Sequence, residues 1–332
     1  MHIKEAARRL NISARAIRFY EEKGLIDPAK DKHNQYRIFQ EKDVWRLQTI
    51  IALRESGMTI EDIKQALANI EGDDYEELLY YLELQRSVMF AKWLEIRGTI
   101  EMTDHMIQVV RTKARLPLED IYQLAERSKR LRDQRSNWQD RWNFDKQAVE
   151  HDERVKHAEA KYRDYEAALA LTVQWVAPLA GERGLDIGTG TGNLAKQLIE
   201  RGALMAGVDQ SKEMLKRCRE KLPEMETKLG NFLALPYLGE QFDFAVTSFA
   251  FHHLSEQQQV LAIEEMRRVL KPHGRICIAD LMYSGAYEKL PCSGESYIHL
   301  EKLIEVLEQR RYVTKWQRLN EHLHIIYAIP IR

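Results

Sequence analysis

The sequence predicts a chain of two fold classes, α/β plus all-α: a helical N-terminal half and a C-terminal half built on a parallel sheet. Three observations predict this division. The chain opens with the pattern of a winged helix-turn-helix, and an apolar heptad repeat runs through residues 75–113. A glycine-rich loop at 184–193 then starts a regular alternation of strands and helices. At 332 residues the chain is long enough for two separate cores.

Composition excludes several classes of protein. The first residues are charged and no apolar run approaches the ~20 residues of a membrane span, so we expect no signal peptide and a cytoplasmic protein. The three cysteines, Cys218, Cys277 and Cys292, lack disulfide or metal-ligand spacing and are expected to be free thiols. The net charge of −1 hides a basic start, because residues 1–37 hold nine Lys and Arg against five Asp and Glu. Such an excess suits contact with phosphates.

Two short helices form the first predicted unit. Apolar side chains share one face of a helix over 3–10, and a second helix over 14–23 is capped by Ser13 and ended by Gly24. The second helix keeps Ile17 for packing. Its outward side chains are Arg15, Arg18 and Tyr20. This pattern alone leaves two interpretations open, a DNA-binding helix pair and a small helical domain with solvated Arg and Tyr side chains.

A wing and two further helices are predicted next. Residues 27–39 are polar and turn-rich and end in the alternating QYRIF, which suggests a small hairpin. A helix over 41–56 follows. The helix over 59–68 opens with Thr59 as its N-cap and Asp62 three residues later.

Three stretches of residues 1–70 then carry a resemblance: AARRLNISARAIRFYEEKGLI, YRIF at the end of the wing, and DVWRLQTIIALRESGMTIEDIKQAL. In this order they resemble the MerR family of winged-helix transcription regulators. The resemblance implies a domain over 1–72 that binds double-stranded DNA at a pseudo-palindromic operator. The residues it assigns to DNA are Arg15 and Arg18, in or beside the major groove, and Tyr20, Tyr36 and Arg37, on phosphates. The chain departs from the family at Phe19, usually tyrosine, and at Gln35, usually a wing glycine.

A coiled coil is predicted over 75–113. Alternating steps of three and four meet Leu79, Leu82, Arg86, Met89, Trp93, Ile96, Ile100, Thr103, Ile107 and Val110. Eight of these ten are apolar, as in the seam of a self-pairing helix, although a long core helix fits the same pattern. The MerR resemblance implies a homodimer through this helix, within a dimerisation segment over 73–115. No cysteine occurs in residues 1–217, which excludes metal sensing through thiolates there.

A change of composition separates the two halves. Pro117 ends the coiled-coil pattern, and a charged helical linker is expected over 116–140. Three large aromatic residues within 137–144 mark the entrance to a new core, so we place the second domain over 141–332.

The loop GLDIGTGTGN lies between a predicted strand over 181–188 and a helix that begins at Asn193, as in dinucleotide-binding folds. Two details argue against NAD. The third glycine of G-x-G-x-x-G falls on Asn193, and the carboxylate of Asp186 would repel a pyrophosphate. A sulfonium or ammonium group would favour that carboxylate, so the residues indicate a positively charged nucleoside and fit S-adenosylmethionine. A second strand ends at Asp209, which is placed to accept hydrogen bonds from ribose hydroxyls.

Further strands are predicted over 226–229, 242–249 and 274–280, with helices between them. The motifs of this half are LDIGTGTGN, GVDQSKEML, GNFLALPY, FDFAVTSFAFHHLS and EEMRRVLKPHGRICIADL. They resemble class I S-adenosylmethionine-dependent methyltransferases over residues 140–332. The most similar group is that of the small bacterial YrrT-like enzymes, whose F-D-x-x-A-x-x-x-D-E-x-V segment is present at 144–155.

This second resemblance implies a Rossmann-like class I methyltransferase sheet. The cofactor contacts it implies are Asp186, Gly188, Gly190 and Gly192 around the methionine part, Asp209 at the ribose, and Asn231 with Phe232 at the adenine. Asn231 departs from the usual aspartate, but an amide oxygen can still accept from the adenine amine.

Two histidines, His252 and His253, follow the predicted fourth strand, where substrate meets cofactor in this fold. His252 is either the base that takes a proton from the methyl acceptor or a packing and capping residue. No Asn/Asp-Pro-Pro-Tyr/Phe motif follows this strand, so methylation of DNA bases at amino groups is not expected. Cys292 follows the fifth strand rather than the fourth and is expected to be a surface cysteine.

Two functions stay open at this level. One is a MerR-type regulator whose second domain methylates a small molecule that also serves as the inducer. The other is a pure regulator that keeps the methyltransferase fold as a sensor of S-adenosylmethionine or its demethylated product.

Overall fold

The computed structural model describes residues 1–31, 36–67, 74–113, 144–157, 163–285 and 297–331, with a few positions between 118 and 133. Gln35, most of the linker at 116–140, the aromatic stretch before Phe144, and Cys292 lie outside the described residues. The chain divides into two compact units, Met1–Lys92 and Trp93–Arg332. None of the helices in the described part of the chain has the length and apolar character that a bilayer crossing requires.

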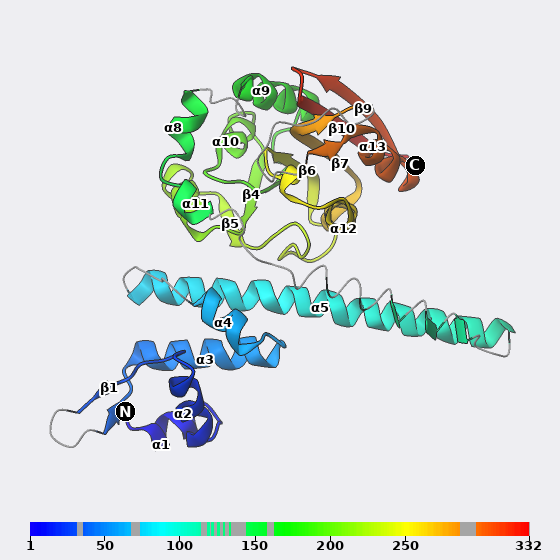
Figure 1. Ribbon diagram of the computed structural model, residues 1–332. Coiled ribbons are helices and arrows are strands. Elements are labelled where there is room, and N and C mark those ends of the chain that lie inside the picture. The colour runs from blue at the N-terminus through cyan, green and yellow to red at the C-terminus, as the bar shows by residue number, and fades with distance from the viewer. Residues whose placement is uncertain are drawn as a thin grey trace. The chain divides into compact units, whose positions relative to one another are not determined.

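The N-terminal unit contains the predicted helices and hairpin (Figure 1). Its elements are α1 (Ile3–Arg9), α2 (Ala14–Glu22), β1 (Ala29–Lys30), β2 (Arg37–Ile38), α3 (Glu41–Glu55) and α4 (Ile60–Ala66). The predicted caps are confirmed, because Ser13 Oγ accepts from the Ala16 amide at 3.1 Å and Thr59 Oγ1 from the Asp62 amide at 3.1 Å. Gly24 follows α2 at φ +70°, a left-handed conformation that favours glycine.

The wing is a two-stranded antiparallel hairpin in which Ala29 pairs with Ile38 and Lys30 with Arg37. Arg46 on α3 connects several segments of the N-terminal unit. Its guanidinium donates to the carbonyls of Leu25 at 2.6 Å and Leu67 at 3.1 Å, and to the Tyr81 hydroxyl at 2.7 Å. These contacts join the segment after α2, the C-terminal end of α4 and the first part of the helix at 74–113.

Helix α5 (Asp74–Lys113) is one helix of 40 residues, which confirms the predicted long helix. Most of the predicted seam is exposed in the single chain: Leu82, Met89, Trp93, Ile96, Ile100, Ile107 and Val110 have exposed fractions between 37% and 56%. Exposed apolar side chains in a row disfavour the alternative of a core helix. Self-pairing through this stripe stays a prediction.

The C-terminal unit is an eight-stranded sheet with the order β5-β4-β3-β6-β7-β10-β9, and β8 pairs with β7. The strands are β3 (Arg183–Ile187), β4 (Leu204–Asp209), β5 (Glu226–Leu229), β6 (Phe242–Ser248), β7 (Leu270–Tyr283), β8 (Ile298–His299), β9 (Tyr312–Arg318) and β10 (Leu323–Pro330). The first five strands of this order are parallel, whereas β10 is antiparallel to both neighbours. The predicted strands agree in position, although β7 extends beyond its expected ends.

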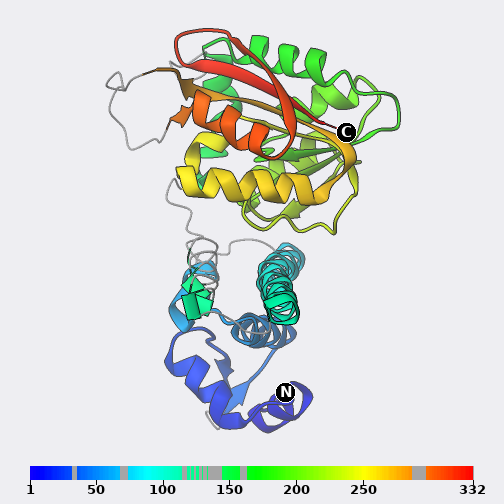
Figure 2. The same cartoon turned by 90° about the vertical axis from the view of Figure 1, so that its right-hand side faces the viewer.

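Helices cover both faces of this sheet. One core cluster joins the sheet to α9 (Tyr165–Val176), α10 (Asn193–Ile199) and α11 (Lys212–Lys221). The other joins it to α12 (Glu256–Val269) and α13 (Leu300–Gln309), which lie side by side in yellow and orange in Figure 2. The doubly wound arrangement places the carboxyl ends of β3, β4 and β6 at one edge.

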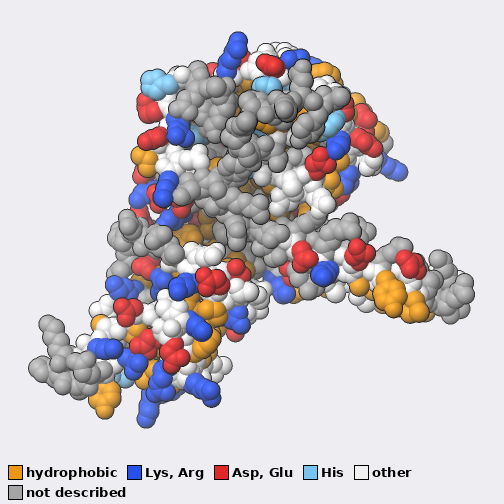
Figure 3. Space-filling model, viewed as in Figure 1, with side chains coloured by type: hydrophobic (Ala, Val, Ile, Leu, Met, Phe, Trp, Pro, Cys, Tyr) orange, Lys and Arg blue, Asp and Glu red, His pale blue; other side chains and the backbone are white. Residues whose placement is uncertain are grey.

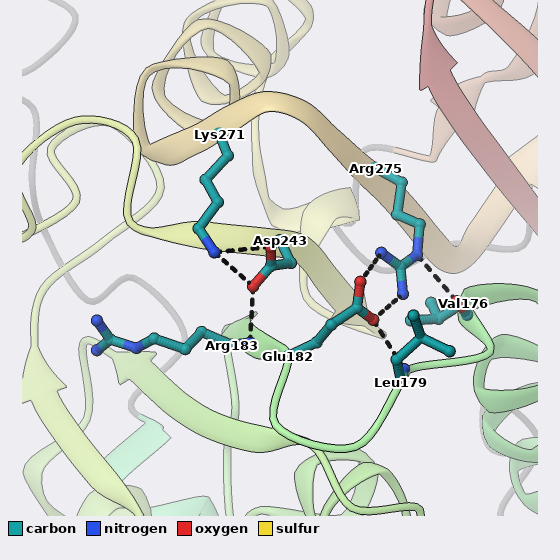
Figure 4. A network of polar contacts seen from close by, with 7 residues as sticks. All are labelled: Val176, Leu179, Glu182, Arg183, Asp243, Lys271 and Arg275. Carbon is teal, nitrogen blue, oxygen red and sulfur yellow. Dashed lines mark hydrogen bonds and ion pairs between the residues drawn. The ribbon is translucent and has the colours of Figure 1, made fainter.

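A network of ion pairs fastens the opposite edge of the sheet, where these strands begin (Figure 4). Arg275 on β7 binds both carboxylate oxygens of Glu182, at 3.0 and 2.6 Å. The hydrogen bonds from Arg275 hold the pKa of Glu182 below its ordinary value. Lys271 binds Asp243 in the same way, at 2.7 and 2.8 Å. The charged groups of this edge therefore satisfy one another, and the cavity lies at the other edge.

Candidate functional site

A cavity of about 380 Å³ lies at the carboxyl edge of the sheet. Six of the residues predicted for cofactor binding and catalysis line it: Gly188, Gly190, Asp209, Asn231, Phe232 and His252. Asp186 and Gly192 do not line it. A volume of this size is at the small end of the range for sites that hold drug-sized ligands, about 300–1,000 Å³.

The glycine loop needs its glycines for two different reasons. Gly188, Gly190 and Gly192 have φ of +71°, +53° and +86°, a region that other residues rarely adopt. A Cβ on Gly192 would also lie 2.8 Å from Cys218 Sγ, so this glycine allows α10 to pack against α11. Of these three glycines, Gly188 and Gly190 line the cavity and Gly192 does not.

Asp186 lies beneath the loop with an exposed fraction of 1%. Its Oδ2 accepts from the Thr189 hydroxyl at 2.9 Å, while Oδ1 has no hydrogen-bond partner among the described residues. Burial raises the pKa of Asp186 to about 7, against the lowering effect of the Thr189 hydrogen bond. A buried carboxylate with one unsatisfied oxygen attracts a proton or a cation.

Asp209 ends β4 and is held by the backbone. Its Oδ2 accepts from the Gly190 amide at 2.8 Å and its Oδ1 from the Ser211 amide at 2.9 Å. Burial raises the pKa of Asp209 to about 6, although both backbone hydrogen bonds lower it. The carboxylate is therefore fixed in one orientation at the wall of the cavity.

A cap segment, defined here as residues 144–157 with α7 (Phe144–Gln147) and α8 (His151–Lys156), completes the wall. Asp145 accepts from the Ser211 hydroxyl at 2.6 Å. Asp152 accepts from the Thr191 hydroxyl at 2.6 Å and from Lys221 Nζ on α11 at 2.9 Å. Burial would raise the pKa of Asp152, but the Thr191 and Lys221 hydrogen bonds outweigh it and hold that pKa below its ordinary value.

The cap segment therefore contacts two of the three loops that carry the predicted cofactor residues, the glycine loop and the loop after β4. It contributes Phe144, Gln147 and His151 to the lining of the cavity. The sequence matched this segment to a motif but did not predict these contacts, because their partners lie 39 to 69 residues away along the chain.

His252 lies in the short helix η2 (Phe251–His253), directly after β6, with an exposed fraction of 3%. Its Nδ1 is 2.6 Å from Oδ1 of Asp280, a fully buried carboxylate near the end of the neighbouring strand β7. His252 Nε2 has no hydrogen-bond partner among the described residues. If Nδ1 carries the proton and donates it to Asp280, Nε2 is free to act as an acceptor.

Asp280 was missed by the sequence analysis, which saw it only as the end of a strand. It also accepts from the backbone amides of Phe251 at 2.6 Å, His252 at 3.2 Å and Leu281 at 2.7 Å. The sequence offered one signal for this contact: Asp280 lies near the end of β7, and the neighbouring strand β6 leads into His252 and His253. Adjacent parallel strands end at one edge, so such residues are candidates for contact.

The residues assigned to DNA lie on α2 and the wing. Arg15 and Arg18 are exposed, Tyr36 is 66% exposed, and Tyr20 is half-buried. Lys and Arg side chains gather over α1 and α2 in the view of Figure 3. Arg37 differs from expectation in one respect, because its Nε donates to both oxygens of Glu21, at 2.9 and 2.6 Å. A phosphate would have to share this guanidinium with Glu21.

Two of the cysteines are buried, and burial raises the pKa of Cys218 and of Cys277 to about 12. Both are thus poor nucleophiles at neutral pH. Within the described ranges, no group of three or more His, Cys, Asp or Glu side chains could hold a metal ion.

Two family models match the chain. The model of the MerR HTH family regulatory protein matches residues 1–70, and that of a methyltransferase domain matches residues 185–274. These matches coincide with α1–α4 and with the strands that carry the glycine loop, Asp209 and His252.

Three curated relatives resemble the C-terminal half. An uncharacterized methyltransferase of Geobacillus thermodenitrificans is 36% identical over 141 residues, which are 42% of this chain and 66% of that protein. One from Anoxybacillus flavithermus is 32% identical over 173 residues, 52% of this chain and 81% of that protein. The uncharacterized methyltransferase YrrT of Bacillus subtilis is 27% identical over 203 residues, 56% and 95% of the two chains. The chain thus spans 66% of the length of the first relative and most of the other two.

Proposed function

Because this chain belongs to the methyltransferase family of these relatives and has a MerR helix-turn-helix domain at its N-terminus, we propose that it couples operator binding to methylation of a small molecule by S-adenosylmethionine. The observation that carries the catalytic part is the His252–Asp280 pair. Nε2 of His252 has no hydrogen-bond partner among the described residues, and His252 lines the cavity that Asp209 also lines.

The residues of the cavity fit S-adenosylmethionine. Asp186 does not line the cavity, but its unsatisfied buried oxygen lies beneath the glycine loop, where a carboxylate favours a ligand with a positive charge nearby. Gly188 and Gly190 offer backbone close to the ligand, Asp209 offers a fixed carboxylate for ribose hydroxyls, and Asn231 with Phe232 would hold the adenine. When bound, the cofactor supplies an electrophilic methyl group.

The chain's own residues would align and activate the acceptor. Asp280 holds the imidazole of His252 in one orientation, and Nε2 receives the acceptor's proton. The cap segment forms part of the cavity wall and is held to the loop after β4 by the Ser211–Asp145 hydrogen bond. Alignment of acceptor and methyl group supplies the rest of the rate enhancement.

The N-terminal unit would bind DNA through α2 and the wing, as a dimer paired along α5. Arg18 is exposed on α2, and from a position beside the major groove it would contact mainly a phosphate. Arg18→Ala should weaken binding at all sequences and reduce the slope of log affinity against log salt by about one. Relaxed preference at a single base pair with an unchanged slope would contradict this assignment.

The alternative is a sensor without catalysis, which would use the same loop and Asp209 but has no need of a buried His–Asp pair. Calorimetric titration with S-adenosylhomocysteine tests what the two share, and we expect binding, with none for NAD. His252→Gln separates them: it should abolish methyl transfer while leaving the affinity for S-adenosylhomocysteine nearly unchanged. If the wild type binds S-adenosylhomocysteine but His252→Gln changes no activity, the base is assigned wrongly.

A further inference from the structure

The lining of the cavity carries almost no charge. Among the described residues that form it, Asp209 is the only Asp or Glu, and there is no Lys or Arg. The wall instead contains aromatic rings. Phe144 lies edge-on to His253 with ring centroids 5.0 Å apart, and Tyr165 packs against Phe249 at 4.9 Å.

This composition disfavours a charged acceptor. An ion that leaves water for such a cavity loses its hydration, and the cost is large unless an opposite charge pairs with it. A carboxylate or phosphate on the acceptor would gain no pairing charge, because the described lining contains no Arg or Lys. An ammonium would need a carboxylate, but Asp209 is the one Asp or Glu in the described lining, and the proposed function assigns it to the ribose hydroxyls of the cofactor.

The His252–Asp280 pair independently indicates a neutral acceptor. A base is required only when the acceptor must lose a proton inside the cavity. A molecule that arrives already ionised, or an amine with a free lone pair, has no use for Nε2 held in place by a buried carboxylate.

We propose that the methyl acceptor is a small uncharged molecule with a weakly acidic hydroxyl or thiol, of the phenol or benzylic thiol class. This proposal rests on the proposed function. The acceptor's O–H or S–H bond breaks, its proton passes to Nε2 of His252, and its electron pair stays on the heteroatom. That heteroatom then bonds to the methyl carbon as the carbon–sulfur bond of the sulfonium breaks, which leaves neutral S-adenosylhomocysteine.

The test compares four probes of similar size on the full chain saturated with S-adenosylhomocysteine: phenol, benzyl mercaptan, benzoate and benzylamine. Ligand-observed NMR titration measures binding without any turnover. We expect phenol and benzyl mercaptan to bind at least about ten-fold more tightly than the two ions, because each ion would lose its hydration without a partner. Equal or tighter binding of benzoate or benzylamine overturns the proposal, as does failure of all four probes to bind.

Failure of S-adenosylhomocysteine itself to bind would instead reject the proposed function, so the two outcomes are distinct.

A gain-of-function variant adds a second test. Gln147 on α7 is half-buried and lines the cavity, so Gln147→Lys introduces a cation at the cavity wall. It should raise benzoate affinity by about ten-fold and leave phenol affinity within a few-fold. Gln147→Met, uncharged and of similar size, is the matched control and should not admit benzoate.

Discussion

At the scale of single residues, two carboxyl groups dominate the electrostatics of the glycine loop. Asp186 and Asp209 both have a raised pKa because burial disfavours their charged forms. In the ligand-free protein an ionised carboxylate at either position therefore opposes folding. A cationic ligand would offset that cost. The two carboxylates therefore lower the stability of the ligand-free protein and raise its affinity for such a ligand.

Asp209→Ala should weaken binding of S-adenosylmethionine and S-adenosylhomocysteine by about ten- to a hundred-fold, since a charge-assisted hydrogen bond to ribose is lost. The pKa of about 6 adds a pH dependence. Affinity in the wild type should fall as the pH drops below 6, because only the ionised form accepts from both hydroxyls. Calorimetry at several pH values measures this. Asp243→Ala, at the far edge of the sheet, is the control and should leave affinity unchanged.

Asp186→Asn should stabilise the ligand-free protein. Its pKa lies at about 7 in the folded state against an ordinary 3.8, so ionisation opposes folding fully above pH 7 and less as the pH falls toward 4. At pH 8 the variant should gain about 1–3 kcal/mol and unfold at a higher temperature, whereas at pH 4 the gain should vanish. The same variant should bind S-adenosylmethionine more weakly. A lower unfolding temperature at pH 8 would show that the carboxylate is paired by a group outside the described residues.

At the scale of elements, local signals in the sequence predicted most of the helices and strands. Caps, end glycines and periodicity specify α1–α4, and short apolar runs specify β3, β4 and β6. β9 and β10 were not predicted, because β10 is antiparallel between β7 and β9 and its place depends on partners rather than on its own pattern.

The same limit applies to the candidate site. The sequence indicated the residues of each loop, since a glycine spacing or an acidic strand end is local. The contact of His252 with Asp280, 28 residues away, and that of the cap segment with Ser211, 66 residues away, arise only when the sheet is assembled.

Helix α5 should pair with a second copy of itself along its exposed apolar stripe. Ile100→Glu with Ile107→Glu places charges at two exposed seam positions and should convert the full chain from dimer to monomer. Loss of the second half-site should also reduce operator affinity steeply. His105→Glu with Gln108→Glu, on the exposed opposite face, is the matched control. Sedimentation measures the mass, and a wild type that is monomeric would refute the pairing.

At the scale of the whole molecule, the cap segment is the first described part of the C-terminal half after the linker. It is fastened to the loops of Asp209 and of Thr191, so a ligand that changes those loops can change the segment where the linker arrives. Coupling between two sites is reciprocal: a ligand that alters operator affinity must have its own affinity altered equally by operator DNA.

Operator DNA should therefore change the affinity for S-adenosylhomocysteine, by a factor within the usual range of about 5- to 150-fold. Titration with and without operator measures this factor. Asp152→Asn weakens the hold of α8 on Thr191 and Lys221 and should reduce the factor, whereas Glu153→Gln, exposed on the same helix, should not. Equal affinities with and without operator would mean that the cofactor serves catalysis only and that the acceptor carries the regulatory signal.

The place of β10 inside the sheet has a consequence for synthesis on the ribosome. β9 leaves the ribosome first but lies outside β10, so it has no sheet partner until residues 323–330 follow. During that interval β7, with its apolar residues Ile276 and Ile278, presents an open edge that can pair with another nascent chain. Helices α1–α4 close through local contacts and can fold much earlier. Translation therefore produces the N-terminal helices first and an incomplete sheet later. A chaperone that shields the edge of β7 would raise the yield of folded protein without altering its stability once folded.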